Sequence, residues 1–259
     1  MKSNDDEQRE SPIRILFGRN AILEALNHDK PMEKILLKRG SIEGTLRVIA
    51  AKARERGIVL QEVDKNKLDE LSETGNHQGV VGLCPAKGYV EIDEILAYAK
   101  SKNEDPFVLL LDGIMDPHNL GAILRSAEAA GIHGVILPKR RSAGLTPTVA
   151  KTSSGAIEHV LISRVANLSD AISKLKKCGL WIACADMEGT DLYTADLSGP
   201  IALIVGSEGA GVRRLLVKNS DFLVKIPMYG HIGSLNASVA AGILMYEVVR
   251  RRNYMGTSP

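Results

Sequence analysis

The chain has 259 residues, of which 25% are charged and 44% hydrophobic, and its formal net charge is +2. This is the composition of an ordinary globular protein with room for one large or two modest domains. It excludes a strongly basic nucleic-acid coat protein, so binding to nucleic acid would depend on locally clustered charge. The candidate clusters, each also compatible with a solvated face, are Lys139, Arg140 and Arg141, then Arg213, Arg214 and Lys218, and finally Arg250, Arg251 and Arg252.

Cysteine usage and the polar start of the chain indicate the compartment. The first residues, MKSNDDEQRESP, lack the apolar region of a signal peptide. No apolar run reaches the ~18–20 residues that a membrane helix requires. Cys84, Cys178 and Cys184 are odd in number and include no C-x-x-C pair, which argues against a disulfide framework or a zinc site. We therefore expect a cytoplasmic protein without a membrane segment or a bound metal.

The sequence predicts an N-terminal tail followed by two domains. Residues 1–12 have the composition of a disordered tail. Residues 13–85 predict a small α/β domain, and residues 86–105 predict a linker that contains the helix IDEILAYAKSK. The elements expected in the small domain are a helix at NAILEAL, a strand at KILLK, a helix over 42–56, a strand at IVLQEV, a short helix at KNKLDEL and a strand at GVVGLC.

Residues 106–259 alternate between strand and helix patterns, which implies a parallel sheet with helices on both faces. The expected strands are FVLLLD, GVILP, HVLISR, WIACAD, IALIVG and FLVKIP. The expected helices run to Ala130, near VAKTSSG, at AISKLKK, at RRLLVK and along the terminal segment.

Three strand-to-helix junctions of this larger domain carry polar side chains. LDGIMDPHNLGAILRSAEAAG, at 111–131, contains Asn119 and Arg125. IALIVGSEGAGVRRLL, at 201–216, contains Glu208, and IPMYGHIGSLNASVAAGILMYEVVRRR, at 226–252, contains Ser234 and Asn236. Ligands of open parallel sheets bind outside the carboxyl ends of the strands, so we expect the three loops to converge.

Structural roles compete with functional ones at these positions. Asn119 and Ser234 are each suited to cap the helix that follows. Arg125 has apolar and small neighbours that look buried, and a buried guanidinium needs an anionic partner. A structural salt bridge and a functional contact therefore both remain open for Arg125.

The three junctions resemble, in order, the three motifs of the SpoU/TrmH ribose 2′-O-methyltransferases of the SPOUT superfamily. The resemblance covers residues 106–252, with mild departures at Ser126, where threonine is common, and Ala237, where valine is common. FGRNAILEAL and NHQGVVG, the latter at 76–82, resemble the small RNA-binding domain of the branch that acts on 23S ribosomal RNA.

The resemblance implies an α/β SPOUT-type parallel sheet with a C-terminal trefoil knot, preceded by the small RNA-binding domain. It further implies S-adenosylmethionine as cofactor, a homodimer, and RNA as substrate, with a guanosine of 23S ribosomal RNA favoured over tRNA. The cofactor pocket implied by the motifs is built mainly from backbone at Gly206, Ile226, Met228 and Leu235. A catalytically silent RNA-binding module of the same fold is the competing interpretation.

The glycine-rich turn argues against a dinucleotide-binding oxidoreductase. Gly206, Gly209 and Gly211 follow the spacing G-x-x-G-x-G, and neither G-x-G-x-x-G nor G-x-x-x-x-G-K-[ST] occurs. Glu208 lies inside the turn, where its charge would repel a pyrophosphate but not a cationic sulfonium. Rossmann-type methyltransferases also lack support, because no glycine-rich loop follows the first strand of the larger domain.

We assign roles by chemistry within the motifs. A guanidinium stays protonated and is a poor general base, so we expect Arg125 to clamp an RNA phosphate and to stabilise a developing alkoxide. Glu208 is expected to orient Arg125, while Asn119, Ser234 and Asn236 hold the loops and the ribose. His118 is a weaker candidate for acid–base work.

The terminal helix from Leu235 onward is apolar around most of its circumference. A helix of this kind must be covered on several sides, either within one subunit or by a second one. The resemblance favours the second subunit, so we expect a homodimer.

Overall fold

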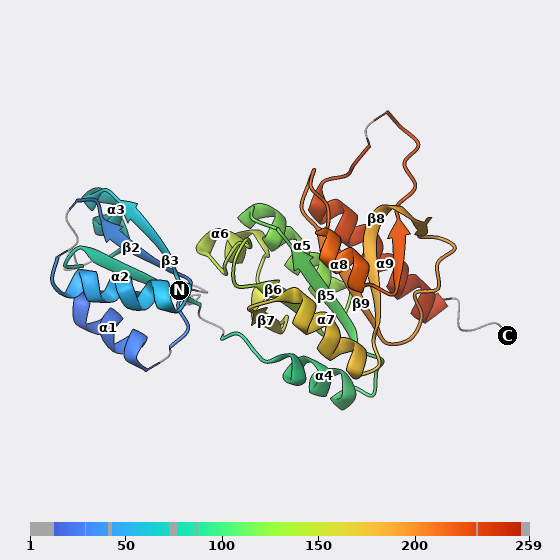
Figure 1. Cartoon of the computed structure of the whole chain (residues 1–259), viewed down its shortest axis with the longest axis horizontal. Helices are drawn as coiled ribbons and strands as arrows, with labels where there is room; N and C mark the ends of the chain where they lie inside the picture. Colours follow the sequence, from blue (N-terminus) through green and yellow to red (C-terminus); the bar gives the residue numbers. More distant parts are fainter. Residues whose placement is uncertain are drawn as a thin grey trace, which may run out of the picture. The chain divides into compact units, whose positions relative to one another are not determined.

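The computed structural model describes residues 13–28, 30–40, 43–72, 77–85, 88–231 and 233–254. The chain divides near Gly88 into two compact units, each with its own sheet (Figure 1). The predicted tail at 1–12 lies outside the described residues. Across the described ranges, no helix combines the length and the hydropathy needed to cross a membrane.

The first unit is a four-stranded mixed sheet with helices on both faces. Its strand order is β1-β4-β2-β3, in which β2 and β3 are parallel and the other neighbours are antiparallel. Alternation along β2 sends Ile35 and Leu37 to the face covered by α1 and α2, and Leu36 to the face covered by α3. The elements are β1 (Ile13–Phe17), α1 (Arg19–Asn27), β2 (Lys34–Lys38), α2 (Thr45–Glu55), β3 (Val59–Val63), α3 (Lys65–Leu71) and β4 (Val80–Pro85).

The elements expected in this unit are present, with two differences. The edge strand β1 is missing from the sequence prediction, because five residues are too few for periodicity to distinguish a strand from a helix. Helix α2 begins at Thr45 instead of at Ile42, which lies outside the described residues.

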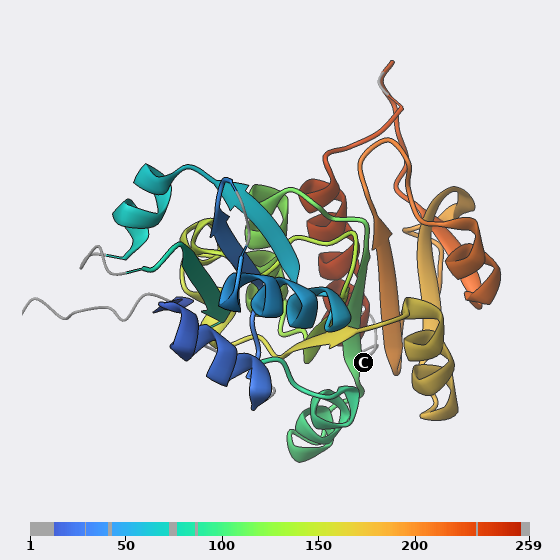
Figure 2. The same ribbon diagram turned by 60° about the vertical axis from the view of Figure 1, so that its left-hand side comes forward.

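The second unit is a six-stranded parallel sheet in the order β10-β8-β9-β5-β6-β7, and the predicted parallel α/β architecture is confirmed. Helices α4, α7 and α8 share one core with the sheet. Helices α5 and α9 pack against each other on the opposite face (Figure 2, green and red). The strands are β5 (Phe107–Asp112), β6 (Gly134–Pro138), β7 (Ile162–Val165), β8 (Trp181–Asp191), β9 (Ile201–Gly206) and β10 (Phe222–Lys225). The helices are α4 (Ile92–Ser101), α5 (Pro117–Ala129), α6 (Pro147–Thr152), the 3₁₀ turn η1 (Ala156–Glu158), α7 (Leu168–Lys177), α8 (Arg214–Asn219) and α9 (Ala237–Tyr254).

The topology creates a crevice at the carboxyl ends of β5 and β9. These two strands are central neighbours, and Asp112 pairs with Gly206 at their ends. The chain then leaves β5 toward α5 on one face and leaves β9 toward α8 on the other. Loops that diverge to opposite faces at adjacent strand ends leave room for a ligand between them.

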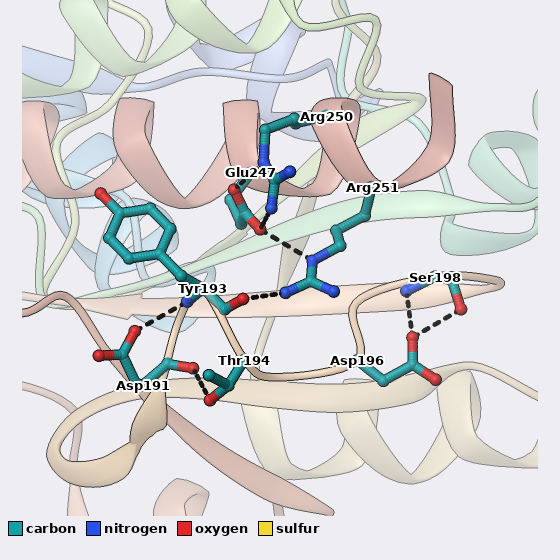
Figure 3. A network of polar contacts seen from close by, with 8 residues as sticks. All are labelled: Asp191, Tyr193, Thr194, Asp196, Ser198, Glu247, Arg250 and Arg251. Carbon is teal, nitrogen blue, oxygen red and sulfur yellow. Dashed lines mark hydrogen bonds and ion pairs between the residues drawn. The ribbon is translucent and has the colours of Figure 1, made fainter. Parts of the chain in front are cut away.

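Helix α9 is tied to the rest of its unit by arginines near its end. The buried carboxylate of Glu247 accepts hydrogen bonds from Arg250 Nε and Nη2, both at 2.7 Å, and from Arg251 Nε at 2.9 Å (Figure 3). The Arg250 and Arg251 guanidiniums hold the pKa of this carboxyl below its ordinary value, although burial opposes the shift. Arg251 also donates to the carbonyl of Tyr193, and Arg252 donates to the carbonyls of Asp105, Pro106 and Gly199. This candidate cluster for nucleic-acid binding therefore forms contacts within the protein.

The trefoil knot of this C-terminal region stays a prediction.

Candidate active site

The three predicted motif loops meet at the carboxyl edge of the second sheet. Asn236 Nδ2, which precedes α9, donates to Asn119 Oδ1 in the first turn of α5 at 3.0 Å. These residues are 117 positions apart in the chain. The glycine turn after β9 lies beside them, because Asp112 and Gly206 are paired. The expected convergence of the three loops is confirmed.

The caps of α5 and α9 differ from those expected. Asp116 caps α5, since its carboxylate accepts from His118 N at 3.1 Å and from Asn119 N at 3.3 Å. Asn236 Oδ1 accepts from Ser238 N at 2.9 Å and so occupies the cap position of α9. The structural alternatives for Asn119 and Ser234, as helix caps, are therefore wrong. Because Asn119 accepts through Oδ1, its Nδ2 remains available to a ligand.

A cavity of about 680 Å³ opens between the glycine turn and the segment before α9. All four residues predicted to bind a cofactor line it: Gly206, Ile226, Met228 and Leu235. Glu208 and Ser234 line it as well, and Asn236 lies between two lining residues, Leu235 and Ala237.

The glycine turn has a shape that side chains would prevent. Ser207 and Gly211 exchange backbone hydrogen bonds of 2.9 and 3.2 Å, which fold the turn back on itself. A Cβ atom on Gly206 would lie 2.1 Å from the carbonyl carbon of Gly211, closer than any tolerable contact. Gly209 and Gly211 have φ angles of +82° and +63°, which glycine adopts without strain. The turn therefore presents backbone atoms, with the exposed Glu208 side chain, to the cavity.

An excursion of β8 supplies the opposite wall. Pairing with β10 stops after Cys184 and resumes at Thr190, so residues 185–189 leave the ladder. Asp186, Met187 and Glu188 from this excursion line the cavity. Asp186, Glu188 and Glu208 give the cavity three carboxylates, and Arg214 and Lys225 add two cations to its lining. Within the described ranges, no three His, Cys, Asp or Glu side chains are grouped closely enough to hold a metal ion.

Arg125 lies on the exposed side of α5, contrary to the buried setting expected from its neighbours. Leu120, Ile123, Leu124 and Ala127 form the buried stripe of this helix, and Arg125 falls outside it. Its Nη1 donates to Ser154 Oγ at 3.2 Å. Among the described residues it forms no ion pair with Glu208, so the expected orienting contact is absent and the salt-bridge alternative is wrong.

Asp112, at the end of β5, is paired with Arg213 across the crevice. The carboxylate is buried and accepts from Arg213 N at 3.0 Å, Nε at 2.8 Å and Nη2 at 2.8 Å. Arg213 follows the glycine turn directly and precedes α8. The pair therefore fastens the end of the turn to the neighbouring strand.

Family models match both units of the chain. The model described as "SpoU rRNA Methylase family" matches residues 106–246, and "RNA 2'-O ribose methyltransferase substrate binding" matches residues 15–90. A Bacillus subtilis protein named as a TrmH family tRNA/rRNA methyltransferase, YacO, is 46% identical over 242 residues, which are 93% of this chain and 97% of the relative. A Staphylococcus aureus relative with the same family name is 46% identical over 243 residues, 93% of this chain and 98% of its own.

The chain belongs to the SpoU/TrmH family of RNA methyltransferases. The SpoU methyltransferase AviRb of Streptomyces viridochromogenes, solved in complex with AdoMet, superposes with a TM-score of 0.58 at 25% identity, covering 96% of this chain and 94% of that one. An AdoMet-bound rRNA methyltransferase of Sinorhizobium meliloti gives a TM-score of 0.57 at 27% identity, covering 93% and 88%. The resemblance found in the sequence is thus confirmed at the level of the family.

Sequence reasoning missed three features of this SpoU/TrmH site. Ser154 follows α6 and has no motif signal, and its φ of +51° is unusual for a residue with a side chain. The excursion of β8 looks like ordinary strand in the sequence. Asp112 marks only the end of a strand there, and its pairing with Arg213 joins positions 101 residues apart.

Replacing Arg213 with alanine should destabilise the second unit, because it leaves the buried Asp112 carboxylate without its cation. We expect the free energy of unfolding, measured by urea titration, to fall by about 1–3 kcal/mol, allowing for the half-exposed guanidinium. Lys218→Ala on the same helix removes an exposed charge that has no ion pair among the described residues, and it is the matched control. An equal loss of stability in both variants would contradict the fastening role of the pair.

Proposed function

We propose that the protein transfers a methyl group from S-adenosylmethionine to the 2′-hydroxyl of a ribose in RNA, with a guanosine of large-subunit ribosomal RNA as the target. The observation that carries this proposal is the hydrogen bond between Asn119 and Asn236 beside a cavity lined by every predicted cofactor residue. This arrangement puts the first and third motifs in contact beside a cavity that the second and third motifs line.

The cavity suits S-adenosylmethionine better than a phosphorylated cofactor. Ile226, Met228 and Leu235 provide apolar surface, and the Gly206 turn admits close approach of backbone amides and carbonyls. Three carboxylates, Asp186, Glu188 and Glu208, outnumber the two cations of the lining, Arg214 and Lys225, so the balance of charge favours a cation over a phosphate. When bound, S-adenosylmethionine supplies an electrophilic methyl group on a cationic sulfur.

Arg125 is proposed to bind an RNA phosphate and to stabilise negative charge that develops on the ribose oxygen. Its guanidinium has no carboxylate partner among the described residues, so it is available to an incoming anion. The contact with Ser154 Oγ restricts the side chain without neutralising it, which preserves the charge for the RNA. Glu208 then acts at the cofactor cavity, not as a partner of Arg125.

The asparagine pair is proposed to position the ribose. Asn236 is held from both sides, by the first turn of α9 and by Asn119. The free Nδ2 of Asn119 is suited to donate to a ribose oxygen. Ser234 is exposed, lines the cavity and supplies a hydroxyl for the same purpose. Such groups raise the rate by holding the reacting oxygen in place.

Ribosomal RNA is favoured over tRNA by the model described as "SpoU rRNA Methylase family", which matches residues 106–246. The relatives carry both substrates in their names.

A cytoplasmic location fits three cysteines that are all free thiols.

Transfer of tritium from labelled S-adenosylmethionine tests the proposal. We expect label in large-subunit ribosomal RNA transcribed in vitro, and nuclease digestion should return a dinucleotide methylated on the guanosine ribose. Label in tRNA alone would show that tRNA is the substrate and that the ribosomal RNA assignment is wrong. The absence of transfer to either RNA would contradict the proposed activity and favour an RNA-binding protein without catalysis.

Arg125→Ala should lower kcat by about 100- to 1000-fold, because it removes charge stabilisation present in the transition state. The dissociation constant for S-adenosylmethionine, measured by calorimetry, should stay nearly unchanged. Arg125→Lys should recover little activity, since an ammonium cannot reproduce a planar two-pronged clamp. Loss of cofactor binding in a folded variant would refute the assigned role.

We further propose that the active protein is a homodimer formed through α9. This helix packs on α5 and β9, yet one side stays uncovered. Val239 and Tyr246, which are 50% and 51% exposed, mark that side, and the partly buried Gly242, Ile243 and Val249 lie between and beyond them. These positions recur at helical spacing, so they form one apolar stripe next to Asn236 and the cavity.

Light scattering at micromolar concentration should give about twice the chain mass of 28.0 kDa. Tyr246→Glu should shift the protein to monomer and abolish activity, because it puts a charge into the apolar stripe. Val48→Glu, at a comparably exposed apolar position in the first unit, should leave the dimer intact. A wild-type mass near 28.0 kDa with full activity would refute the proposal.

A further inference from the structure

We infer that the loop after β6, with Lys139, Arg140 and Arg141, is the surface on the second unit that binds the RNA phosphate backbone. This inference rests on the proposed function. It assigns to RNA one of the three cationic clusters found in the sequence, and it excludes the other two as the main binding surface.

The loop is fastened beside the active site. It begins where Lys139 N donates to the carbonyl of Val165 at 2.8 Å. It ends where Ala143 N donates to the carbonyl of Ile114 at 2.8 Å. Ile114 belongs to the connection from β5 to α5, which leads into Asp116 and Asn119. The cations of the loop are therefore adjacent to the first motif.

All three side chains of the loop are exposed, and none forms an ion pair in the parts of the chain that the structure describes. Arg141 has a φ of +59°, a conformation that glycine or asparagine adopts more easily. Arginine at this position therefore holds its backbone in an unfavourable, left-handed conformation. Unpaired exposed cations grouped in this way attract a polyanion, and phosphate contacts supply most of the salt-dependent affinity for nucleic acid.

The other two clusters have different uses. Arg213 is bound to the buried Asp112 and Arg214 lines the cofactor cavity, so Lys218 is left as a single exposed cation in that cluster. Arg250 and Arg251 are paired with Glu247, and Arg252 is bound to carbonyls.

Two exposed cations, Lys151 and Arg125, extend the surface of the loop toward the site. Lys151 lies in the last turn of α6, and Ser154, which follows it, contacts Arg125. The end of α6 lies against the start of α5, because Thr152 Oγ1 donates to the carbonyl of Pro117 at 3.4 Å, so the chain that leaves the loop reaches the proposed phosphate clamp. An RNA strand that follows them would bring its ribose to Asn119.

The double variant Arg140→Gln/Arg141→Gln tests the inference in the full-length protein. Filter binding of in vitro transcribed large-subunit ribosomal RNA, over a series of KCl concentrations, gives the affinity and its salt dependence. We expect affinity to fall by on the order of tenfold, and the slope of log K against log salt to shrink by about two. In the methyl-transfer assay the KM for RNA should rise, with kcat at saturating RNA and the cofactor dissociation constant near wild type.

The matched control is Lys100→Gln/Lys177→Gln, which removes the same charge. These exposed lysines lie in the last turns of α4 and α7, at the amino edge of the sheet, and neither lines the cavity. The control should bind RNA like wild type. Unchanged binding by the arginine variant, or an equal loss in the control, would overturn the inference. RNA binding is measured without catalysis, so the two proposals fail separately. A wild-type protein that binds RNA but transfers no methyl group would refute the proposed function, whereas the inference about the RNA-binding surface would still hold.

Discussion

A buried carboxylate at the end of a central strand organises the catalytic end of this protein. Asp112 closes β5, where the sheet is covered on both faces, and a charge in that position requires a cation with satisfied hydrogen bonds. Arg213 meets this need from the far end of the glycine turn. The turn is consequently held between two fixed points, its start in β9 and its end on Asp112. The cavity wall is thus set by an ion pair together with glycines that permit a tight backbone.

The same need for partners explains how the arginines and lysines are divided. A net charge of +2 leaves little overall attraction for a polyanion. Arginines near the end of α9 neutralise Glu247 and bind carbonyls, which anchors the last helix to the loop after β8 and to the start of β5. Arg125 and the loop after β6 lack such partners among the described residues. These cations are therefore available to a substrate at the carboxyl edge of the sheet.

Helix α9 combines three demands that would conflict in a shorter helix. Its first residues support the Asn119–Asn236 contact, its middle packs on α5 and β9, and its end is held by the arginine network. Eighteen residues give five turns, so separate faces and separate ends can meet these demands. The uncovered stripe at Val239 and Tyr246 begins within one turn of Asn236, which links the proposed dimer contact to the geometry of the site.

Local pattern and motif were sufficient to predict part of this architecture. Alternating apolar runs predicted the parallel sheet, and the order of three motifs predicted the family and the residues of the cavity, since Gly206, Ile226, Met228 and Leu235 lie in it together. Which polar groups meet depends on the assembled fold. Asp116 caps α5 in place of Asn119, because the turn after β5 brings its carboxylate to two free amides. Arg125 is exposed because the angular position of a residue on a packed helix depends on which stripe faces the sheet. The Asp112–Arg213 and Asn119–Asn236 contacts join positions 101 and 117 residues apart, and no local periodicity encodes a pairing that exists only after the strands have assembled.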